Sequence, residues 1–230
     1  MKKTLALVAV ADTKLEETID ALKLSNDNFL FQEVLLLTSK KIETHKKFNG
    51  LNVINVSPIN SFKEYNNFII FKLHKYIKTS HILLIQWDGF IINKKNWENS
   101  FLEFDYIGSP FIPRALDYSY SRTKKGKFYS VGNGGFSLRS LNLLKSAEEY
   151  NLEDDVYITN NHEDGFFCVL HREFLESKGL KWAPFEVSQN FAIENPISFS
   201  EITKFPFGFH GKKFLAIYKF IAPIKSFFER

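Results

Sequence analysis

Residues 81–90 read HILLIQWDGF, and this stretch indicates the fold class. The run from 81 to 86 is short and almost continuously apolar, which is typical of a strand that is buried on both faces. Three earlier segments have the same character, at 4–11, 33–39 and 51–59. Helical patterns alternate with these segments. The sequence therefore predicts an α/β fold with a mostly parallel central sheet that is flanked by helices.

The helices between these strands have recognisable starting signals. Thr13 and Glu16 have the spacing of a capping box, in which a hydroxyl and a carboxylate satisfy free N–H groups at a helix start. Ser61 and Glu64 have the same spacing, and the helix that they open is predicted to reach about Lys78.

Two carboxylates follow strands directly, Asp12 after the first and Asp88 after the fourth. In parallel sheets, ligands bind outside the carboxyl ends of the strands. Asp88 has two interpretations. It is either a helix cap or solvated surface acid, or a ligand for a hard cation such as magnesium or manganese, which prefers oxygen donors.

Composition excludes several classes of protein. The chain has 230 residues and a net charge of +4, with basic residues scattered along it, so a nucleic-acid partner is not expected. Cys168 is the single cysteine, which rules out an intramolecular disulfide. No stretch of 18 apolar residues is present, so no membrane span is predicted. The apolar start at 4–11 is interpreted as a core strand rather than a signal peptide, which favours a cytoplasmic protein.

The second half changes character, and no linker divides it from the first, so we expect a single domain over 1–230. The pattern predicts a strand at 104–111, an exposed loop at 115–130, a helix capped by Ser140, a helix over 161–179, a strand at 181–187, and an aromatic turn at 205–211.

The segment VGNGGFSLRS at 131–140 has three glycines in four residues. Glycine permits positive φ angles and lets a ligand approach bare backbone. The spacing matches no standard phosphate loop. Asn133, Gly134 and Gly135 are therefore candidate ligand-binding residues, and a tight bulge between strands is the alternative.

Two adjacent acids, Glu163 and Asp164, stand at a predicted helix start. Acids are common there because the helix dipole favours them. A carboxylate held in a cleft is instead a candidate general base that takes a proton from a hydroxyl. Adjacent helical side chains diverge by about 100°, so the two acids are expected to have different roles. His210 is either structural or a ligand for a manganese-type ion.

Taken in order, five short motifs resemble a known set: QWDG, DYIGSPF, VGNGGFSLRS, HEDGFF and FGFHG. The chain resembles a bacterial and fungal family that is regarded as glycosyltransferases and catalogued as a domain of unknown function. More distantly, it resembles GT-A glycosyltransferases of the fringe and core-1 galactosyltransferase kind. The resemblance extends from the first strand to about residue 211.

The resemblance implies roles for particular residues. Asp88 would be the last acid of a GT-A Asp-x-Asp motif and would bind a divalent cation, manganese or magnesium, with His210 completing its shell. Gln86 stands in place of the first acid, a departure that bears on how strongly a metal is held. Asp164 would be the base of an inverting enzyme, with Glu163 beside it.

On the donor side, the resemblance places the end of the first strand near the nucleotide. The candidate donor- or acceptor-binding residues are those at the first and fourth strand ends and in the glycine segment: Ala11, Asp12, Thr13, Gln86, Trp87, Asn133, Gly134 and Gly135. The resemblance implies a GT-A-like fold. The implied reaction transfers a sugar from a nucleotide-sugar donor to a glycan or lipid-linked acceptor, in bacterial capsule or lipopolysaccharide synthesis.

Two rival functions stay open at this point. A nucleotidyltransferase would carry a basic, glycine-rich loop after the first strand, and residues 11–17 contain no glycine. A non-catalytic nucleotide- or sugar-binding module is compatible with the loss of the first acid at Gln86.

The basic-aromatic tail at 212–230 has two interpretations as well. Lysines alternate with large apolar residues, as in segments that lie on anionic membranes, which would make the protein peripheral on the inner membrane. The alternative is a terminal helix that packs on the core.

Overall fold

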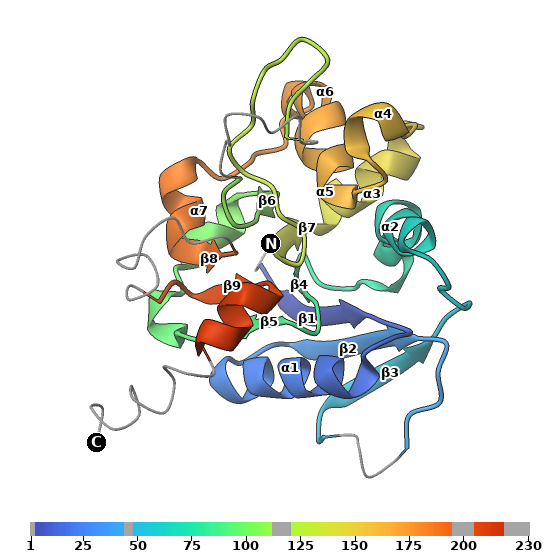
Figure 1. Ribbon diagram of the computed structural model, residues 1–230, viewed down its shortest axis with the longest axis vertical. Helices are drawn as coiled ribbons and strands as arrows, with labels where there is room; N and C mark the ends of the chain where they lie inside the picture. The colour runs from blue at the N-terminus through green and yellow to red at the C-terminus, as the bar shows by residue number, and fades with distance from the viewer. Residues whose placement is uncertain (1–2, 44–47, 112–120, 195–204, 219–230) are drawn as a thin grey trace.

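The computed structural model describes residues 3–43, 48–111, 121–194 and 205–218 (Figure 1). A six-stranded sheet forms the centre, in the order β3-β2-β1-β4-β7-β6. Its strands are β1 (Leu5–Val10), β2 (Glu33–Thr38), β3 (Leu51–Asn55), β4 (His81–Ile85), β6 (Tyr106–Ile107) and β7 (Phe136–Ser140).

Most of the sheet is parallel, as the sequence predicts. β1 pairs in parallel with β2 and with β4, and β2 pairs in parallel with β3. β7 runs antiparallel to both β4 and β6. Every residue of β1 and of β4 is buried, because other elements cover both faces of the sheet. The continuous apolar runs in the sequence follow from this double cover.

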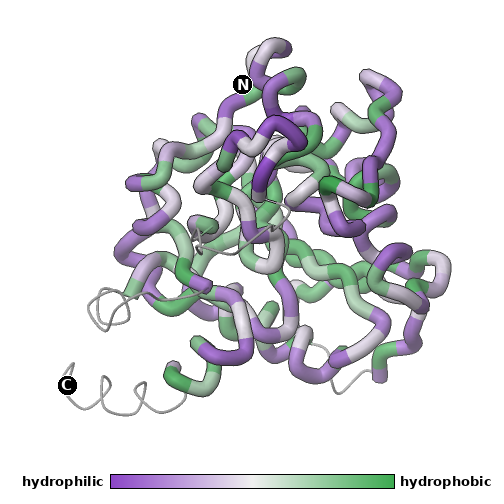
Figure 2. The backbone as a smooth tube through the Cα atoms, turned by 45° about the horizontal axis from the view of Figure 1, so that its top comes forward, coloured by the Kyte–Doolittle hydropathy of each residue, from purple (hydrophilic) through white to green (hydrophobic). Residues whose placement is uncertain are grey.

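Helices and a smaller sheet cover the two faces (Figure 1). On one face, α1 (Leu15–Asn28) packs with the three-stranded sheet β5-β9-β8. On the other face lie α2 (Phe62–Phe71) and α3 (Leu141–Glu149). Figure 2 shows the apolar residues gathered along the interior strands, whereas polar residues are concentrated in the outer turns.

The remaining elements are short. They are β5 (Gly89–Ile91), β8 (Ala192–Ile193) and β9 (Gly208–His210) in the smaller sheet, the helices α4 (Val156–Thr159), α5 (Glu163–Gly165), α6 (Arg172–Ser177) and α7 (Phe185–Phe191), the 3-10 turns η2 (Leu73–Tyr76), η3 (Lys94–Asn96) and η4 (Asn99–Glu103), and the π-helical turn η5 (Phe166–Leu170).

The start of α1 differs from the prediction. No side chain caps this helix, and the residue at its N-cap position is Lys14, in the left-handed conformation with φ of 53°. The capping box at Thr13 is therefore wrong. The one at Ser61 is partly confirmed, because the Ser61 hydroxyl accepts from the Glu64 N–H while the Glu64 carboxylate accepts from the N–H of Asn60.

Several predicted boundaries are also wrong. The helix expected to reach Lys78 ends at Phe71 and gives way to η2. The strand predicted at 51–59 ends at Asn55. The strand predicted at 181–187 is reduced to a single bridge between Trp182 and Tyr106, and α7 begins at Phe185, after its N-cap residue Pro184. The aromatic turn contains the strand β9.

The helix predicted over 161–179 is broken into α5, η5 and α6. The N–H of His171 bonds to the carbonyl of Phe166 at 3.1 Å, which is the wider spacing of a π-helical turn. Gly179 ends the segment with φ of 92°, as predicted. Turns of this kind are frequent beside functional sites.

Two predictions fall partly outside the described residues. In the loop predicted at 115–130, the described part from 121 folds back so that Arg122 bridges to Phe128, and Tyr129 is buried. In the tail, residues 212–218 are helical and Phe214 packs in the core. Residues 219–230, on which the membrane prediction depends, lie outside the described residues. Within the described ranges, no helix has the length and apolarity needed to cross a membrane.

Candidate functional site

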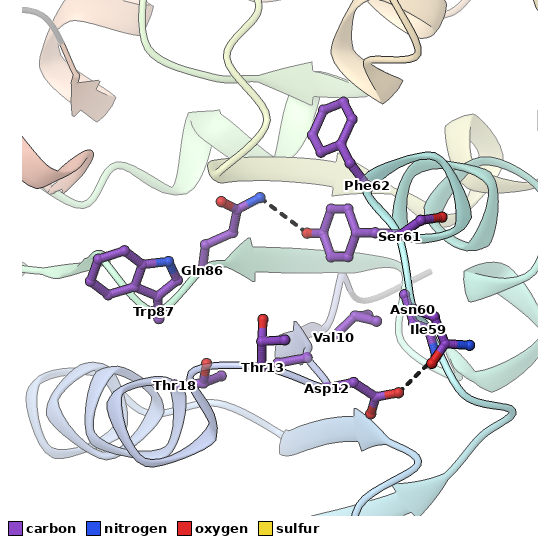
Figure 3. Close-up of a pocket in the computed structure, with 12 residues that line it drawn as sticks. Val10, Asp12, Thr13, Thr18, Ile59, Asn60, Ser61, Phe62, Gln86 and Trp87 are labelled. Atoms are coloured by element: carbon purple, nitrogen blue, oxygen red, sulfur yellow. Dashed lines mark hydrogen bonds between the residues drawn. The ribbon is translucent and has the colours of Figure 1, made fainter.

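A pocket opens at the carboxyl ends of β1 and β4, where the sequence places its candidate ligand-binding residues (Figure 3). It has a volume of about 320 Å³, which is at the small end of the range for ligand sites. Residues 10–13 form one wall, residues 59–62 and Tyr65 form another, and Gln86 and Trp87 come from the end of β4. Ala11, Asp12, Thr13, Gln86 and Trp87 therefore share one cavity.

Within this wall, Asp12 ties together the loops after β1, β2 and β3. Its carboxylate accepts hydrogen bonds from the Thr38 hydroxyl, from the N–H and hydroxyl of Ser39, and from the Ile59 N–H, at 2.7–2.8 Å. Burial raises the pKa of Asp12, but these bonds outweigh it and lower the pKa below its ordinary value. The carboxylate is fully engaged by the chain, so Asp12 shapes the pocket wall.

Gln86 links the pocket to a second group of polar residues. Its amide nitrogen donates to the Tyr65 hydroxyl at 3.2 Å, and its amide oxygen lies 3.2 Å from His210 Nε2. Its backbone N–H donates to the carbonyl of Gly135. The residue that replaces the first acid of the metal motif therefore joins the pocket, the histidine and the glycine segment.

His210 lies between two carboxylates. Its Nε2 is 3.3 Å from Asp88 Oδ1, and its Nδ1 is 3.3 Å from Glu194 Oε1. Burial lowers the pKa of His210, but pairing with Asp88 and Glu194 outweighs it and raises the pKa to about 10. The ring is therefore protonated near neutral pH when no other cation is bound.

The residues around His210 include donor types that a divalent cation accepts. Asp88 Oδ1 is buried, and its only contact with a polar partner among the described residues is the 3.3 Å ion pair with His210 Nε2. Asp88 Oδ1, His210 Nε2 and the Gln86 amide oxygen supply the oxygen and nitrogen donors that manganese and magnesium accept. Among the described residues, no three His, Cys, Asp or Glu side chains converge as a metal cluster. The protein thus offers two strong ligands and one amide oxygen.

The glycine segment is packed against the protein's own side chains. The positive φ in this segment belongs to Asn133, at 54°, rather than to a glycine. A Cβ on Gly134 would collide with the Glu163 carboxylate, and one on Gly135 would collide with the His210 ring. The Asn133 amide donates to oxygens of Ser109 and Pro110. Because Gly134 and Gly135 have no Cβ, the Glu163 carboxylate and the His210 ring can both approach the same stretch of backbone.

Behind the segment lies a buried ion pair. Arg139 Nη2 lies 2.7 Å from Glu163 Oε1, and the two side chains are 0% and 4% exposed. Arg139 Nε also donates to the Ser137 hydroxyl, and its guanidinium lies over the Tyr106 ring. Burial lowers the pKa of Arg139, but the neighbouring Glu163 and Tyr106 outweigh it and raise the pKa above its ordinary value. Arg139 stays charged and fixes Glu163.

Asp164 contacts the same glycine segment through a backbone N–H group. Its Oδ2 accepts from the Gly134 N–H at 3.1 Å, and its Oδ1 accepts from the Gly165 N–H at 2.8 Å. Burial, and then the charge of Glu163, raise the pKa of Asp164 well above its ordinary value, although Arg139 opposes them. Desolvation therefore outweighs the helix start, which the sequence alone leaves undecided.

The predicted residues thus form one connected set. The pocket reaches Gln86, which contacts His210; His210 lies against Gly135, and the adjacent Gly134 contacts both Glu163 and Asp164. Sequence reasoning missed Tyr65, Arg139 and Glu194. Arg139 was the easiest of these to predict from the sequence, because a charged residue within the strand pattern FSLRS at 136–140 requires a partner if the strand is buried.

Comparison with known families gives one match. The family described as "Protein of unknown function (DUF5672)" matches residues 50–210. No curated protein sequence matches the chain.

A solved structure at a TM-score of 0.50 supports the fold. The galactosyltransferase LgtC, crystallised with donor and acceptor sugar analogues, is similar at a TM-score of 0.50 and 12% identity, over 90% of this chain and 86% of that one. The bifunctional IspDF from Campylobacter jejuni is similar at a TM-score of 0.46 and 12% identity, over 79% of this chain and 49% of that one. The chain has a GT-A-like α/β fold.

Proposed function

We propose that this chain, which belongs to the DUF5672 family, is a glycosyltransferase that moves a sugar from a nucleotide-sugar donor to an acceptor hydroxyl. One observation carries the proposal. Four segments that are far apart in the sequence, at 86–88, 133–139, 163–164 and 210, meet in one polar network beside a pocket at the carboxyl edge of the sheet. The GT-A-like fold supports it.

In the proposed reaction, Asp164 acts as general base. Its carboxylate takes the proton from the acceptor hydroxyl, and the oxygen attacks the anomeric carbon as the proton leaves. The bond from that carbon to the diphosphate oxygen breaks, and its electron pair leaves with the nucleoside diphosphate. Attack from the face opposite the leaving group inverts the anomeric configuration. The raised pKa makes Asp164 a stronger base, provided that it is ionised.

Glu163 and Arg139 position this base. The ion pair holds Glu163 against Gly134, and the N–H of Gly134 holds one oxygen of Asp164. In this proposal the two adjacent acids have different roles. The pairing of Glu163 with a permanent cation leaves Asp164 as the carboxylate that is available for proton transfer.

The pocket is the proposed donor site. Asp88 and His210, with the Gln86 amide oxygen, would hold a divalent cation, which when bound supplies positive charge to the diphosphate of the donor. The proposed acceptor is a glycan or lipid-linked saccharide of surface-polysaccharide synthesis. A non-catalytic binding module with the same pocket would bind the donor without turning it over.

Turnover tests the proposal. The protein would be incubated with a panel of UDP-, GDP- and dTDP-sugars, with manganese and a mixture of simple saccharide acceptors, and release of nucleoside diphosphate would be followed. We expect one donor to be consumed faster with acceptors than without them. Binding of a nucleotide sugar without release above a protein-free control would identify a binding module and contradict the proposal.

A further inference from the structure

Two lysines lie over the same pocket residue. The ammonium groups of Lys14 and Lys212 each lie 5.5 Å from the centroid of the Trp87 ring. The two charges are therefore no further apart than twice that distance. Lys14 comes from the loop after β1, and Lys212 follows β9 by two residues, so separate parts of the fold supply them.

The backbone at Lys14 has an unfavourable, left-handed conformation. A non-glycine residue with φ of 53° is uncommon, and here it occupies the N-cap position without a capping side-chain bond. Conformations of this kind are unfavourable and concentrate at functional sites. The expected capping box at Thr13 is lost at this point. The local sequence rule therefore fails beside the pocket, where Lys14 meets Trp87.

Pairing with acidic side chains does not account for the positions of the two lysines. Lys14 pairs with Glu17 at 3.1 Å, but both side chains are about half exposed, and such pairs contribute little. In the part of the chain that the structure describes, Lys212 contacts the Trp87 ring and pairs with no carboxylate. Cation–π contact gives each lysine a modest attraction to the ring, whereas the two ammonium groups repel each other. An anion between them would remove this repulsion.

The position of Trp87 in the pocket indicates which kind of anion would bind. Trp87 lies at one end of the pocket, and Ile59 and Asn60 lie at the other (Figure 3). Next to Trp87 in the chain is Asp88, which is paired with His210. Because Lys14 and Lys212 lie at Trp87, the negatively charged group of a ligand that fills the pocket would lie at that end.

We infer that Lys14 and Lys212 form an anion clamp over Trp87 that binds the diphosphate of a nucleoside diphosphate. This inference rests on the proposed function for the donor, and it deepens that function by assigning the charge recognition to the protein's own lysines. Because Gln86 replaces an acid at the neighbouring cation position, the clamp supplies positive charge that does not depend on a metal.

Calorimetric titration tests the clamp in a buffer that contains EDTA. Inorganic pyrophosphate, UDP, GDP, dTDP and the corresponding nucleosides would be titrated into the parent protein, the single variants K14Q and K212Q, and their double variant. Lys213→Gln is the matched control, because Lys213 is exposed on the same helix without the contact to Trp87. Circular dichroism would verify that each variant is folded.

We expect pyrophosphate and at least one nucleoside diphosphate to bind the parent. Each single variant should bind them about tenfold more weakly, since it loses one charge-assisted contact to the diphosphate. Nucleoside binding and the control should be unchanged. Affinity should fall with added salt in the parent and less so in the double variant.

Three results would overturn the clamp: no diphosphate binding by the parent, unchanged affinity in the double variant, or an equal loss in K213Q. The clamp and the proposed reaction fail separately. If the lysines bind diphosphate but no sugar is transferred, the clamp stands and the transferase does not. If sugar is transferred and the double variant keeps its donor affinity, the clamp is wrong.

Discussion

Two buried clusters each hold a basic side chain against carboxylates, and they differ in the permanence of the positive charge. Arg139 pairs with Glu163, and both are almost fully buried, at 0% and 4% exposed. His210 lies between Asp88 and Glu194. The side chain of His210 is 18% exposed, that of Asp88 is 8% exposed and that of Glu194 is 21% exposed. A guanidinium cannot lose its proton in a protein, whereas an imidazolium can.

The difference suggests different tasks. The arginine cluster is sealed and permanently charged, which suits a scaffold that fixes the backbone under Asp164. The histidine cluster is more exposed and its imidazolium can lose its proton, which suits the proposed position for another cation or a ligand phosphate. Gly134 and Gly135 place the two clusters on adjacent residues.

The largest effect that would test this comparison is on folding. Arg139→Met should lower the free energy of unfolding by about 3–5 kcal/mol, because it leaves the Glu163 carboxylate buried without a partner. His210→Gln should cost about 1–2 kcal/mol, since water reaches that cluster. Urea denaturation measures both. Adding Glu163→Gln to Arg139→Met should restore part of the loss. Equal losses for the two single variants would remove the distinction between the clusters.

A smaller effect sharpens the claim that the histidine cluster exchanges its cation. Manganese at about 100 times its dissociation constant should stabilise the parent by about 2.7 kcal/mol, as a rise in melting temperature. Asp88→Asn should abolish the rise, because it replaces the charged ligand. Asp20→Asn, at an exposed position on α1, is the control. Stabilisation that persists in Asp88→Asn would show that the metal binds elsewhere.

Much of the fold could be predicted because one physical cause dominates the first half. Strands covered on both faces must be apolar throughout, so β1, β2 and β4 are visible in the sequence, and Ser61 and Ser140 cap their helices as predicted. The second half was less predictable. Strands of two or three residues such as β6 and β9 have no period to detect, and the π-helical turn breaks an otherwise continuous helical pattern.

For the candidate site, the motif residues were identified but their partners were not. The family resemblance assigned Asp88 and His210, 122 positions apart, to one metal shell, but the residues themselves carry no signal that they meet. Glu194 has no distinguishing neighbours in the sequence. The capping-box rule failed at the start of α1. Lys14 occupies the N-cap position in the left-handed conformation, and its side chain contacts Trp87. The roles of these residues stay predictions until variants are measured.

The most direct measurement of the central claim is a comparison of Asp164→Asn with Glu163→Gln, in sugar transfer and in donor binding. With a donor and acceptor identified by turnover, Asp164→Asn should lower the transfer rate by about 10²–10⁴ while donor affinity stays near that of the parent. In the parent, the rate should rise with pH, because the folded-state pKa of Asp164 is raised and a base acts only when ionised. Glu163→Gln should retain transfer at a reduced rate, since its role is to position. Parental transfer by Asp164→Asn, or loss of transfer in Glu163→Gln alone, would contradict the account.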